Sequence, residues 1–168
     1  MDKQNDEEAF VQHIQDNKGI VFKVCNSYCR NTSDREDLAQ EIIYQLWRSW
    51  HNYKTTYKFS TWMYRIALNT AISFYRKEKK ETPVTPITEQ FINIKAPETQ
   101  PETEQHILLL QQFISELKEL DKALMLLYLE EKSHKEISEI IGITETNVGT
   151  KIGRIKIFLK QKFSQINR

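Results

Sequence analysis

All four prolines of this 168-residue chain lie between residues 83 and 101. Proline has no backbone N–H and a fixed φ, so this spacing forbids a continuous helix and favours an extended connector. On both sides of the segment, apolar residues recur at the three-and-four spacing of amphipathic helices. We therefore expect an all-α chain with two small helical domains, residues 1–80 and 105–168, joined by a Pro/Glu-rich linker over 81–104. A plain tether and an active role are both open for this linker.

The first two apolar groups, Phe10–Ile14 and Val21–Cys29, predict two short helices with Gly19 between them. Cys25 and Cys29 are the only cysteines, and their spacing suggests neither a metal site nor a disulfide framework. We expect two core thiols in a reducing compartment. No apolar run is long enough to span a bilayer, and the amino end is acidic rather than signal-like, so we expect a soluble, cytoplasmic protein.

Capping signals divide the rest of the first domain. Ser33 with Glu36 forms a capping-box pattern and predicts the start of a third helix. Helical periodicity is lost over 51–58, so we expect a loop there, and a fourth helix capped by Ser60 or Thr61. One face of this fourth helix is apolar, and another could follow a phosphate backbone or be an ordinary solvated face. That polar and basic stripe comprises Arg65, Asn69, Ser73, Arg76 and Lys80.

The third and fourth predicted helices also have an unusual distribution of charge. No acidic residue occurs between Glu41 and Glu78, whereas six residues there are basic and ten are aromatic. Phosphates bind such cations and unstacked bases stack on flat rings, so the composition suits single-stranded nucleic acid. An aromatic helical core with a basic exposed face accounts for the composition equally well at this point.

The total net charge of +1 conceals this asymmetry. Residues 1–80 carry a net charge of +3, residues 81–120 carry −5, and residues 121–168 carry +3. Two basic ends around an acidic middle are therefore compatible with a nucleic-acid partner.

The second domain ends in a helix-turn-helix pattern. Ser133 with Glu136 forms a capping box that opens a short helix. Gly142 then predicts a tight turn, and Thr144 caps a longer last helix that could lie in a DNA major groove. After Glu145 the chain has six basic residues and no acidic one, which favours DNA over the non-DNA uses of this motif.

The candidate DNA-contacting side chains are the polar ones early in that last helix. Asn can pair with adenine in bidentate fashion, Glu can accept from cytosine, and Lys and Arg anchor phosphates or read guanine. The candidates are Thr144, Glu145, Thr146, Asn147, Thr150, Lys151 and Arg154.

Two segments from opposite ends of the chain resemble one family. The run DLAQEIIYQLW followed by YKFSTWMYRIALNTAISFYRK resembles the second conserved region of bacterial RNA polymerase sigma factors. The run LDKALMLLYLEEKSHKEISEIIGITETNVGTKIGRIKIFLK resembles their fourth region. With only these two regions and a short linker, the chain resembles the extracytoplasmic-function (ECF) subfamily. The resemblance implies a factor that binds core RNA polymerase and directs promoter-specific transcription initiation, with an anti-sigma factor as a possible further partner.

The resemblance also implies roles for individual residues. In the family, an acidic face docks on the clamp helices of the polymerase β′ subunit, which corresponds here to Asp37, Leu38, Gln40 and Glu41. The loop and helix that follow melt the minus-ten element and capture flipped bases of the non-template strand. Those positions are Asn52, Tyr53, Lys54, Tyr57, Lys58, Phe59, Ser60, Trp62, Arg65, Asn69, Arg76 and Lys77. The fourth region reads the minus-thirty-five duplex through a recognition helix that maps to residues 144–154.

The linker of related proteins threads towards the polymerase cleft, where acidic residues can stand in for phosphate. Residues suited to that role are Glu81, Glu89, Glu98, Glu102 and Glu104. Other positions depart from the family pattern. Asp121 stands where many relatives have Pro, and Gly149 and Gly153 stand where larger, often basic, residues are usual. Base preference therefore cannot be transferred from relatives, and which ring stacks on which base is open.

A polymerase-independent helix-turn-helix regulator is the alternative from another class. It predicts tight operator binding without polymerase, and it leaves the acid-free aromatic stretch unexplained. A nucleic-acid enzyme is less expected, because the four histidines are dispersed and no carboxylate cluster has metal-site spacing. We therefore expect no catalytic residue, no metal site and no cofactor.

Overall fold

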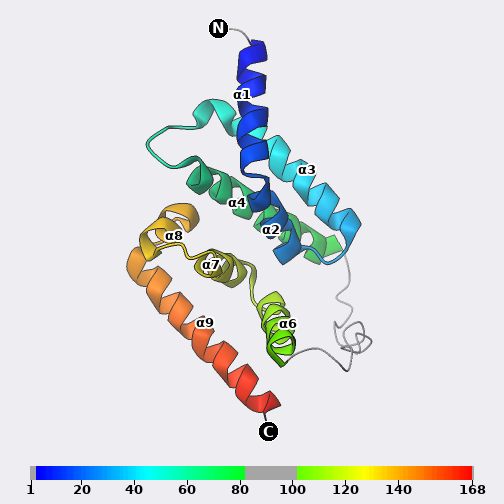
Figure 1. The fold of residues 1–168 in the computed structure, drawn as a ribbon, viewed down its shortest axis with the longest axis vertical. Coiled ribbons are helices and arrows are strands. Elements are labelled where there is room, and N and C mark those ends of the chain that lie inside the picture. Colours follow the sequence, from blue (N-terminus) through cyan, green and yellow to red (C-terminus); the bar gives the residue numbers. More distant parts are fainter. Residues whose placement is uncertain (1–2, 82–101, 168) are drawn as a thin grey trace.

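The computed structural model describes residues 3–81 and 102–167, which contain helices and no strand (Figure 1). The first part contains α1 (Lys3–Asp16), α2 (Lys18–Tyr28), α3 (Thr32–Ser49), the 3-10 turn η1 (Trp50–Asn52) and α4 (Phe59–Glu81). The second contains α6 (Glu102–Ser115), α7 (Glu119–Leu129), α8 (His134–Ile141) and α9 (Glu145–Ile166). The all-α prediction is confirmed for these residues.

The predicted linker, residues 81–104, falls almost entirely outside the described residues. Two of its candidate acidic residues, Glu89 and Glu98, also lie outside the described residues. Glu102 and Glu104 lie in the first turn of α6, where a carboxylate interacts favourably with the amino end of the helix dipole.

The core of the first part lies where α2, α3 and α4 pack against one another. Val24, Leu38, Ile42 and Leu46 have no exposed surface, and Leu68 of α4 has almost none. Each comes from the apolar face that three-and-four spacing creates on its helix. Burial of such a side chain contributes about 1.5–3 kcal/mol, so this packing fixes how α3 and α4 lie side by side.

Two helix starts differ from the sequence-based prediction. Asn31, rather than Ser33, caps α3, because the Asn31 side-chain oxygen accepts a hydrogen bond of 2.7 Å from the Asp34 N–H. Asn is at least as good as Ser at this position. The helix α4 already begins at Phe59, ahead of the predicted caps, because the Trp62 N–H reaches the carbonyl oxygen of Lys58 at 3.2 Å.

The first two helices are confirmed, but the break between them lies at Asn17, and Gly19 falls inside the first turn of α2. Cys25 and Cys29 are both buried, which confirms their place in the core. Burial raises the pKa of the Cys25 thiol to about 11, although nearby Arg35 opposes the shift. Among the described residues, no helix combines the length and apolar character needed to cross a membrane.

The helix α4 is central because both parts of the chain pack on it. It contacts α2 and α3 on one side, and α7 and α8 of the second part on another (Figure 1). The buried apolar side chains consequently form a cluster that includes residues of both parts. The helix α9 packs against α7 and α8, which places it on the outside of this arrangement.

Candidate polymerase and nucleic-acid interface

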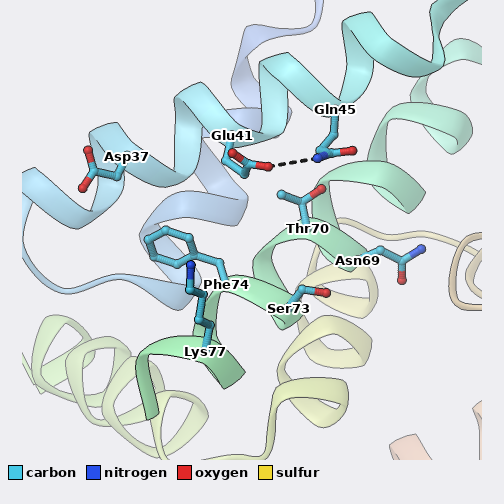
Figure 2. A pocket seen from close by; sticks show the side chains of 8 residues that line it. All are labelled: Asp37, Glu41, Gln45, Asn69, Thr70, Ser73, Phe74 and Lys77. Carbon is cyan, nitrogen blue, oxygen red and sulfur yellow. Dashed lines mark hydrogen bonds between the residues drawn. The ribbon is translucent and has the colours of Figure 1, made fainter. Parts of the chain in front are cut away.

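The proposed polymerase-docking residues lie on α3, beside a groove that α3 forms with α4 (Figure 2). Asp37, Gln40 and Glu41 are exposed, and the Gln45 side chain donates a hydrogen bond of 2.9 Å to the Glu41 carboxylate. Leu38 differs from the prediction, because it is fully buried in the core and has no surface to offer a partner. The groove is lined by Asp37, Glu41, Gln45, Asn69, Thr70, Ser73, Phe74 and Lys77.

Four rings form an aromatic cluster where η1 and the following loop meet the start of α4. The cluster consists of Trp50, Tyr53, Phe59 and Trp62, with ring centroids 5.2–6.3 Å apart. Most pairs meet edge-to-face or at a tilt, an arrangement worth about 0.5–1.5 kcal/mol per pair beyond burial. Three of the four, Tyr53, Phe59 and Trp62, are predicted DNA-contacting residues, and the structure brings them together.

Tyr57 has a different environment from the aromatic cluster. Its side chain is 50% exposed, and it lies on the loop that joins η1 to α4. The Tyr53 hydroxyl donates a hydrogen bond of 3.3 Å to the Tyr57 backbone carbonyl, which ties this loop to the cluster. Tyr57 is therefore the ring among the candidates that is most accessible to a flipped base.

The aromatic cluster also contains contacts that sequence reasoning missed. His13 of α1 stacks on Phe59 with ring centroids 4.7 Å apart, and it lies 5.5 Å from Trp50. The Trp50 indole N–H donates a hydrogen bond of 3.0 Å to the Asp6 carboxylate. Neither α1 residue has a local pattern that could have indicated this contact, because the partners are more than 35 residues away.

The exposed side chains around the cluster are polar or basic. They are Asn52, Lys54, Lys58 and Arg65, and Ser60 is half-buried beside them. No acidic residue occurs in this stretch of the sequence, and the exposed cations Lys54, Lys58 and Arg65 outnumber the one carboxylate that reaches the cluster, that of Asp6 in α1. This excess of positive charge suits a phosphate backbone.

The predicted basic stripe of α4 is divided in the structure. Asn69, Ser73 and Lys77 line the groove towards α3. Arg76 instead reaches α7, where its Nε lies 3.9 Å from the Glu119 carboxylate. At about 100° per residue, Arg76 is turned about 60° from Ser73 and about 100° from Lys77, so its side chain reaches α7 while theirs line the groove with α3. The stripe is thus not one continuous solvated face.

The helix-turn-helix prediction is confirmed in α8 and α9. The Ser133 and Thr144 hydroxyl oxygens each accept a 3.1 Å hydrogen bond, from the Glu136 and Asn147 N–H groups respectively. Gly142 turns the chain with φ +82°, a conformation that favours glycine. These capping bonds and the left-handed glycine fix the angle between the two helices.

The candidate recognition residues occupy the start of α9. Its apolar face is buried against the rest of the second part through Val148, Ile152 and Ile155. The polar side chains on the other face are exposed, whereas Lys151 is half-buried. Exposed are Thr144, Glu145, Thr146, Asn147, Thr150 and Arg154. The geometry therefore leaves one face of this helix free to enter a major groove.

No group of three or more His, Cys, Asp or Glu side chains within residues 3–81 and 102–167 is placed to hold a metal ion.

Comparison with known proteins assigns both parts of the chain. Residues 13–81 match the family model of Sigma-70 region 2, and residues 107–159 match that of Sigma-70, region 4. The chain is 30% identical to ECF RNA polymerase sigma factor SigW of Bacillus subtilis (strain 168) over 98% of this chain and 94% of SigW. It is 29% identical to ECF RNA polymerase sigma factor SigM of the same organism, over 95% of each chain.

A solved structure has a similar fold. It is that of CnrH in complex with the cytosolic domain of CnrY, with a TM-score of 0.67, 16% identity, and coverage of 95% of this chain and 90% of that one. The relatives named here are sigma factors rather than polymerase-independent regulators, and the two matched regions stand in the expected order. The chain therefore belongs to the ECF group of RNA polymerase sigma factors.

Proposed function

We propose that this ECF sigma factor divides its work among three surfaces. Asp37, Gln40 and Glu41 on α3 dock on the clamp helices of the polymerase β′ subunit. The loop before α4 and the start of α4 open the minus-ten element and hold a flipped base. The start of α9, residues 144–154, reads the minus-thirty-five element as duplex DNA.

The position of the accessible Tyr57 ring beside the packed aromatic cluster is the observation that supports this proposal most directly. Tyr57 is half exposed on a loop without acidic residues, next to the packed aromatic cluster. Lys54 and Lys58 flank this ring in the sequence and are exposed. Cations can therefore hold the phosphates while Tyr57 stacks on a base.

The magnitudes are compatible with strand capture. Extruding a base costs a few kcal/mol, and stacking on an aromatic side chain returns about 1–3 kcal/mol per base. Because the two terms nearly cancel, contacts with polymerase and with the duplex element decide whether the promoter opens. Promoter binding should accordingly weaken steeply as the salt concentration rises.

Run-off transcription with purified core polymerase tests the proposal. On a duplex promoter template, we expect Tyr57→Ala to produce much less promoter-specific transcript than wild type. On a template that is already melted at the minus-ten element, we expect Tyr57→Ala to produce about as much transcript as wild type. The matched control is Tyr44→Ala, because Tyr44 of α3 is similarly exposed but lies outside the loop. Equal activity of Tyr57→Ala and wild type on both templates would exclude the stacking role of this ring.

A further inference from the structure

The first residue of α8, His134, lies against the candidate recognition helix α9. A Cβ at Gly149 of α9 would lie 3.5 Å from both Nδ1 and Cε1 of the His134 ring, which is an ordinary contact distance. Because glycine has no side chain, this edge of the imidazole can face the backbone of α9 directly. The His134 side chain is also exposed, so another part of its ring remains accessible to a partner.

Gly149 lies at the edge of the face that α9 leaves exposed. At about 100° per residue, Gly149 is turned about 60° from Thr146 and about 100° from Thr150 around the helix axis. Both threonines are exposed and are candidate DNA-contacting residues. Gly149 is also turned about 100° from Val148, which is fully buried. The His134 ring therefore borders the exposed face of α9.

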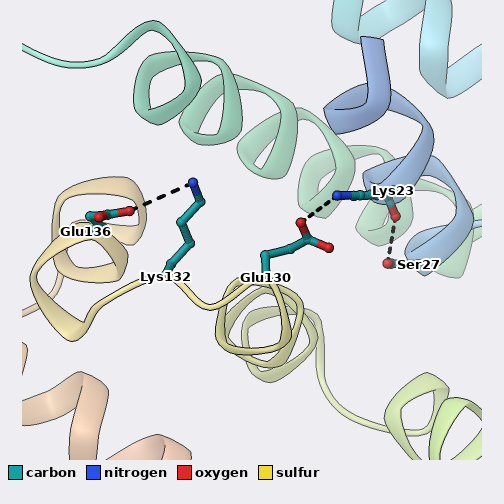
Figure 3. Close-up of polar contacts among 5 residues, drawn as sticks. All are labelled: Lys23, Ser27, Glu130, Lys132 and Glu136. Atoms are coloured by element: carbon teal, nitrogen blue, oxygen red, sulfur yellow. Dashed lines mark hydrogen bonds and ion pairs between the residues drawn. The ribbon is translucent and has the colours of Figure 1, made fainter. Parts of the chain in front are cut away.

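Side-chain charges around His134 on the α8 side cancel. The loop before α8 and the first turn of α8 contain three glutamates and two lysines. The Glu136 carboxylate points towards Lys132, whose ammonium lies 3.8 Å away (Figure 3). Glu130 forms an ion pair with Lys23 of α2, which brings the number of ammonium groups to three (Figure 3). No excess of negative charge on this side therefore repels a phosphate from His134.

The helix α9 adds positive charge to the same region. It carries five basic side chains and one carboxylate, that of Glu145. Glu145 is turned about 40° from Gly149 and lies about one turn before it, so its charge acts on the same side of α9. The basic side chains outnumber it, and the net charge of the helix attracts DNA.

An imidazole at this place suits a phosphate. In a helix-turn-helix, the second helix enters the major groove, and the first helix crosses the DNA backbone. A residue that begins the first helix and lies beside the second is thus close to the phosphates that border the groove. A neutral imidazole has one N–H and a protonated imidazole has two, whereas a phosphate oxygen only accepts. His134 can therefore donate a hydrogen bond to a phosphate in either protonation state.

We propose that His134 is a further DNA-contacting residue, which donates a hydrogen bond to a backbone phosphate at the edge of the minus-thirty-five major groove. Gly149 provides the space in which its ring lies. This inference rests on the proposed role of the start of α9 and adds a residue of α8 to that surface. Because phosphate contacts fix register without reading sequence, loss of His134 should weaken binding about equally for all minus-thirty-five sequences.

Binding of the holoenzyme to promoter duplexes that carry single methylphosphonates tests this contact. A methylphosphonate replaces one charged phosphate oxygen by a neutral methyl group. We expect substitution at one or two phosphates beside the minus-thirty-five element to weaken wild-type binding about three- to tenfold. His134→Ala should weaken binding to the unmodified duplex by a similar factor. It should also become insensitive to substitution at one of those phosphates, because the two changes remove the same interaction.

Two further variants define the chemistry of the contact. His134→Lys keeps a donor and adds a full charge, so it should bind at least as tightly as wild type, with a salt dependence that is steeper by about one in slope. His106→Ala is the matched control and should bind like wild type. His106 is an exposed histidine of α6, and its ring lies beside Phe163, about 21 Å along α9 from Gly149.

Substitutions at Gly149 test whether it holds the ring in place. Gly149→Ala should keep the wild-type pattern of sensitivity, because a Cβ there would make an ordinary contact with His134. Gly149→Leu should push the ring away and should lose sensitivity at the same phosphate as His134→Ala. Wild-type sensitivity of Gly149→Leu at that phosphate would overturn the role of Gly149.

The outcome for His134 can be separated from that for the proposed function. Circular dichroism and thermal unfolding verify that each variant is folded. Wild-type affinity of His134→Ala, or an equal loss on every duplex whether modified or not, would overturn the phosphate contact. If Asn147→Ala weakens binding while His134→Ala does not, only this inference fails. If neither Asn147→Ala nor His134→Ala changes binding, the proposed role of α9 fails as well.

Discussion

The Trp50 indole N–H donates a hydrogen bond of 3.0 Å to the carboxylate of Asp6, 44 residues earlier in the chain. This bond attaches α1 to the aromatic cluster from which the proposed base-binding loop extends. Phe10 of α1 contacts the same ring edge-to-face, with centroids 5.4 Å apart. The helix α1 carries no candidate DNA-contacting residue, but it therefore supports the loop that carries several of them.

Loss of the Asp6 carboxylate should weaken this support. We expect Asp6→Ala to destabilise the protein by about 1–3 kcal/mol, because a partly buried N–H donor is left without its acceptor. Promoter opening should decrease with it, since the cluster that anchors the loop is less ordered. Thermal unfolding and run-off transcription measure the two effects. Glu8→Ala, an exposed position on the same helix, serves as the control, and a similar loss there would contradict the specific role of Asp6.

Alanine substitutions at Trp62 and Tyr57 should distinguish a ring that stabilises the fold from a ring that is free to bind DNA. Trp62 is half-buried and contacts three other rings, so Trp62→Ala is expected to cost about 2–4 kcal/mol of unfolding free energy. Tyr57 is half exposed, and Tyr57→Ala should change stability by less than about 0.5 kcal/mol. Chemical denaturation of both variants measures these differences. A large loss of stability in Tyr57→Ala would show that its ring is part of the core.

The caps of the helix-turn-helix should respond differently to the same substitution. Ser133→Ala and Thr144→Ala each remove a capping acceptor and should cost about 1 kcal/mol. Thr144→Ala should in addition weaken binding to a minus-thirty-five duplex, because Thr144 begins the exposed face of α9. Thr144→Ser keeps the hydroxyl and should retain stability. Calorimetry and fluorescence anisotropy test this pattern, and equal DNA affinity of the two Ala variants would argue against a contact by Thr144.

Replacement by alanine should change the stability of the protein in opposite directions at two glycines. A Cβ at Gly153 in α9 would meet nothing within 4 Å, so Gly153→Ala should stabilise the protein by about 0.5–1 kcal/mol through helix propensity. Gly142→Ala should instead destabilise it by about 1 kcal/mol or more, because φ is +82° there. Denaturant midpoints compare the two variants. Stabilisation by both would mean that the turn does not need the left-handed conformation.

Tyr64 should make the protein sensitive to alkali. Burial, followed by the charge of Glu130, raises the pKa of Tyr64 to about 12 from an ordinary value near 10. The unfolded chain therefore loses this proton first, and the stability that the group contributes is fully present below about pH 10. It is lost as the pH rises from about 10 towards 12. Unfolding measured across this range should show a smaller loss for Tyr64→Phe than for wild type, and equal losses would exclude the effect.

Much of the second part of the chain could be predicted because its signals are local. Ser133 and Thr144 each bond to a residue three positions later in the chain, and Gly142 makes the turn through its own backbone conformation. The sequence spacing of these residues therefore already determines the caps and the turn. The same holds for the apolar faces of the helices, whose period is a property of one helix. The start of α3 was misplaced by two residues because Asn31 and Ser33 are both good caps, and only the hydrogen bond to Asp34 distinguishes them.

By itself, the sequence determined that this chain is helical, where its helix-turn-helix lies, and that it resembles the ECF sigma factors. Only the tertiary structure decided which candidates stay exposed. Leu38 became core, Arg76 was paired with Glu119, and Lys122, which any surface pattern would leave in water, was buried between Tyr28 and Tyr75. The reason is physical: these outcomes depend on which helices pack on α4, and that packing depends on contacts between residues far apart in the chain.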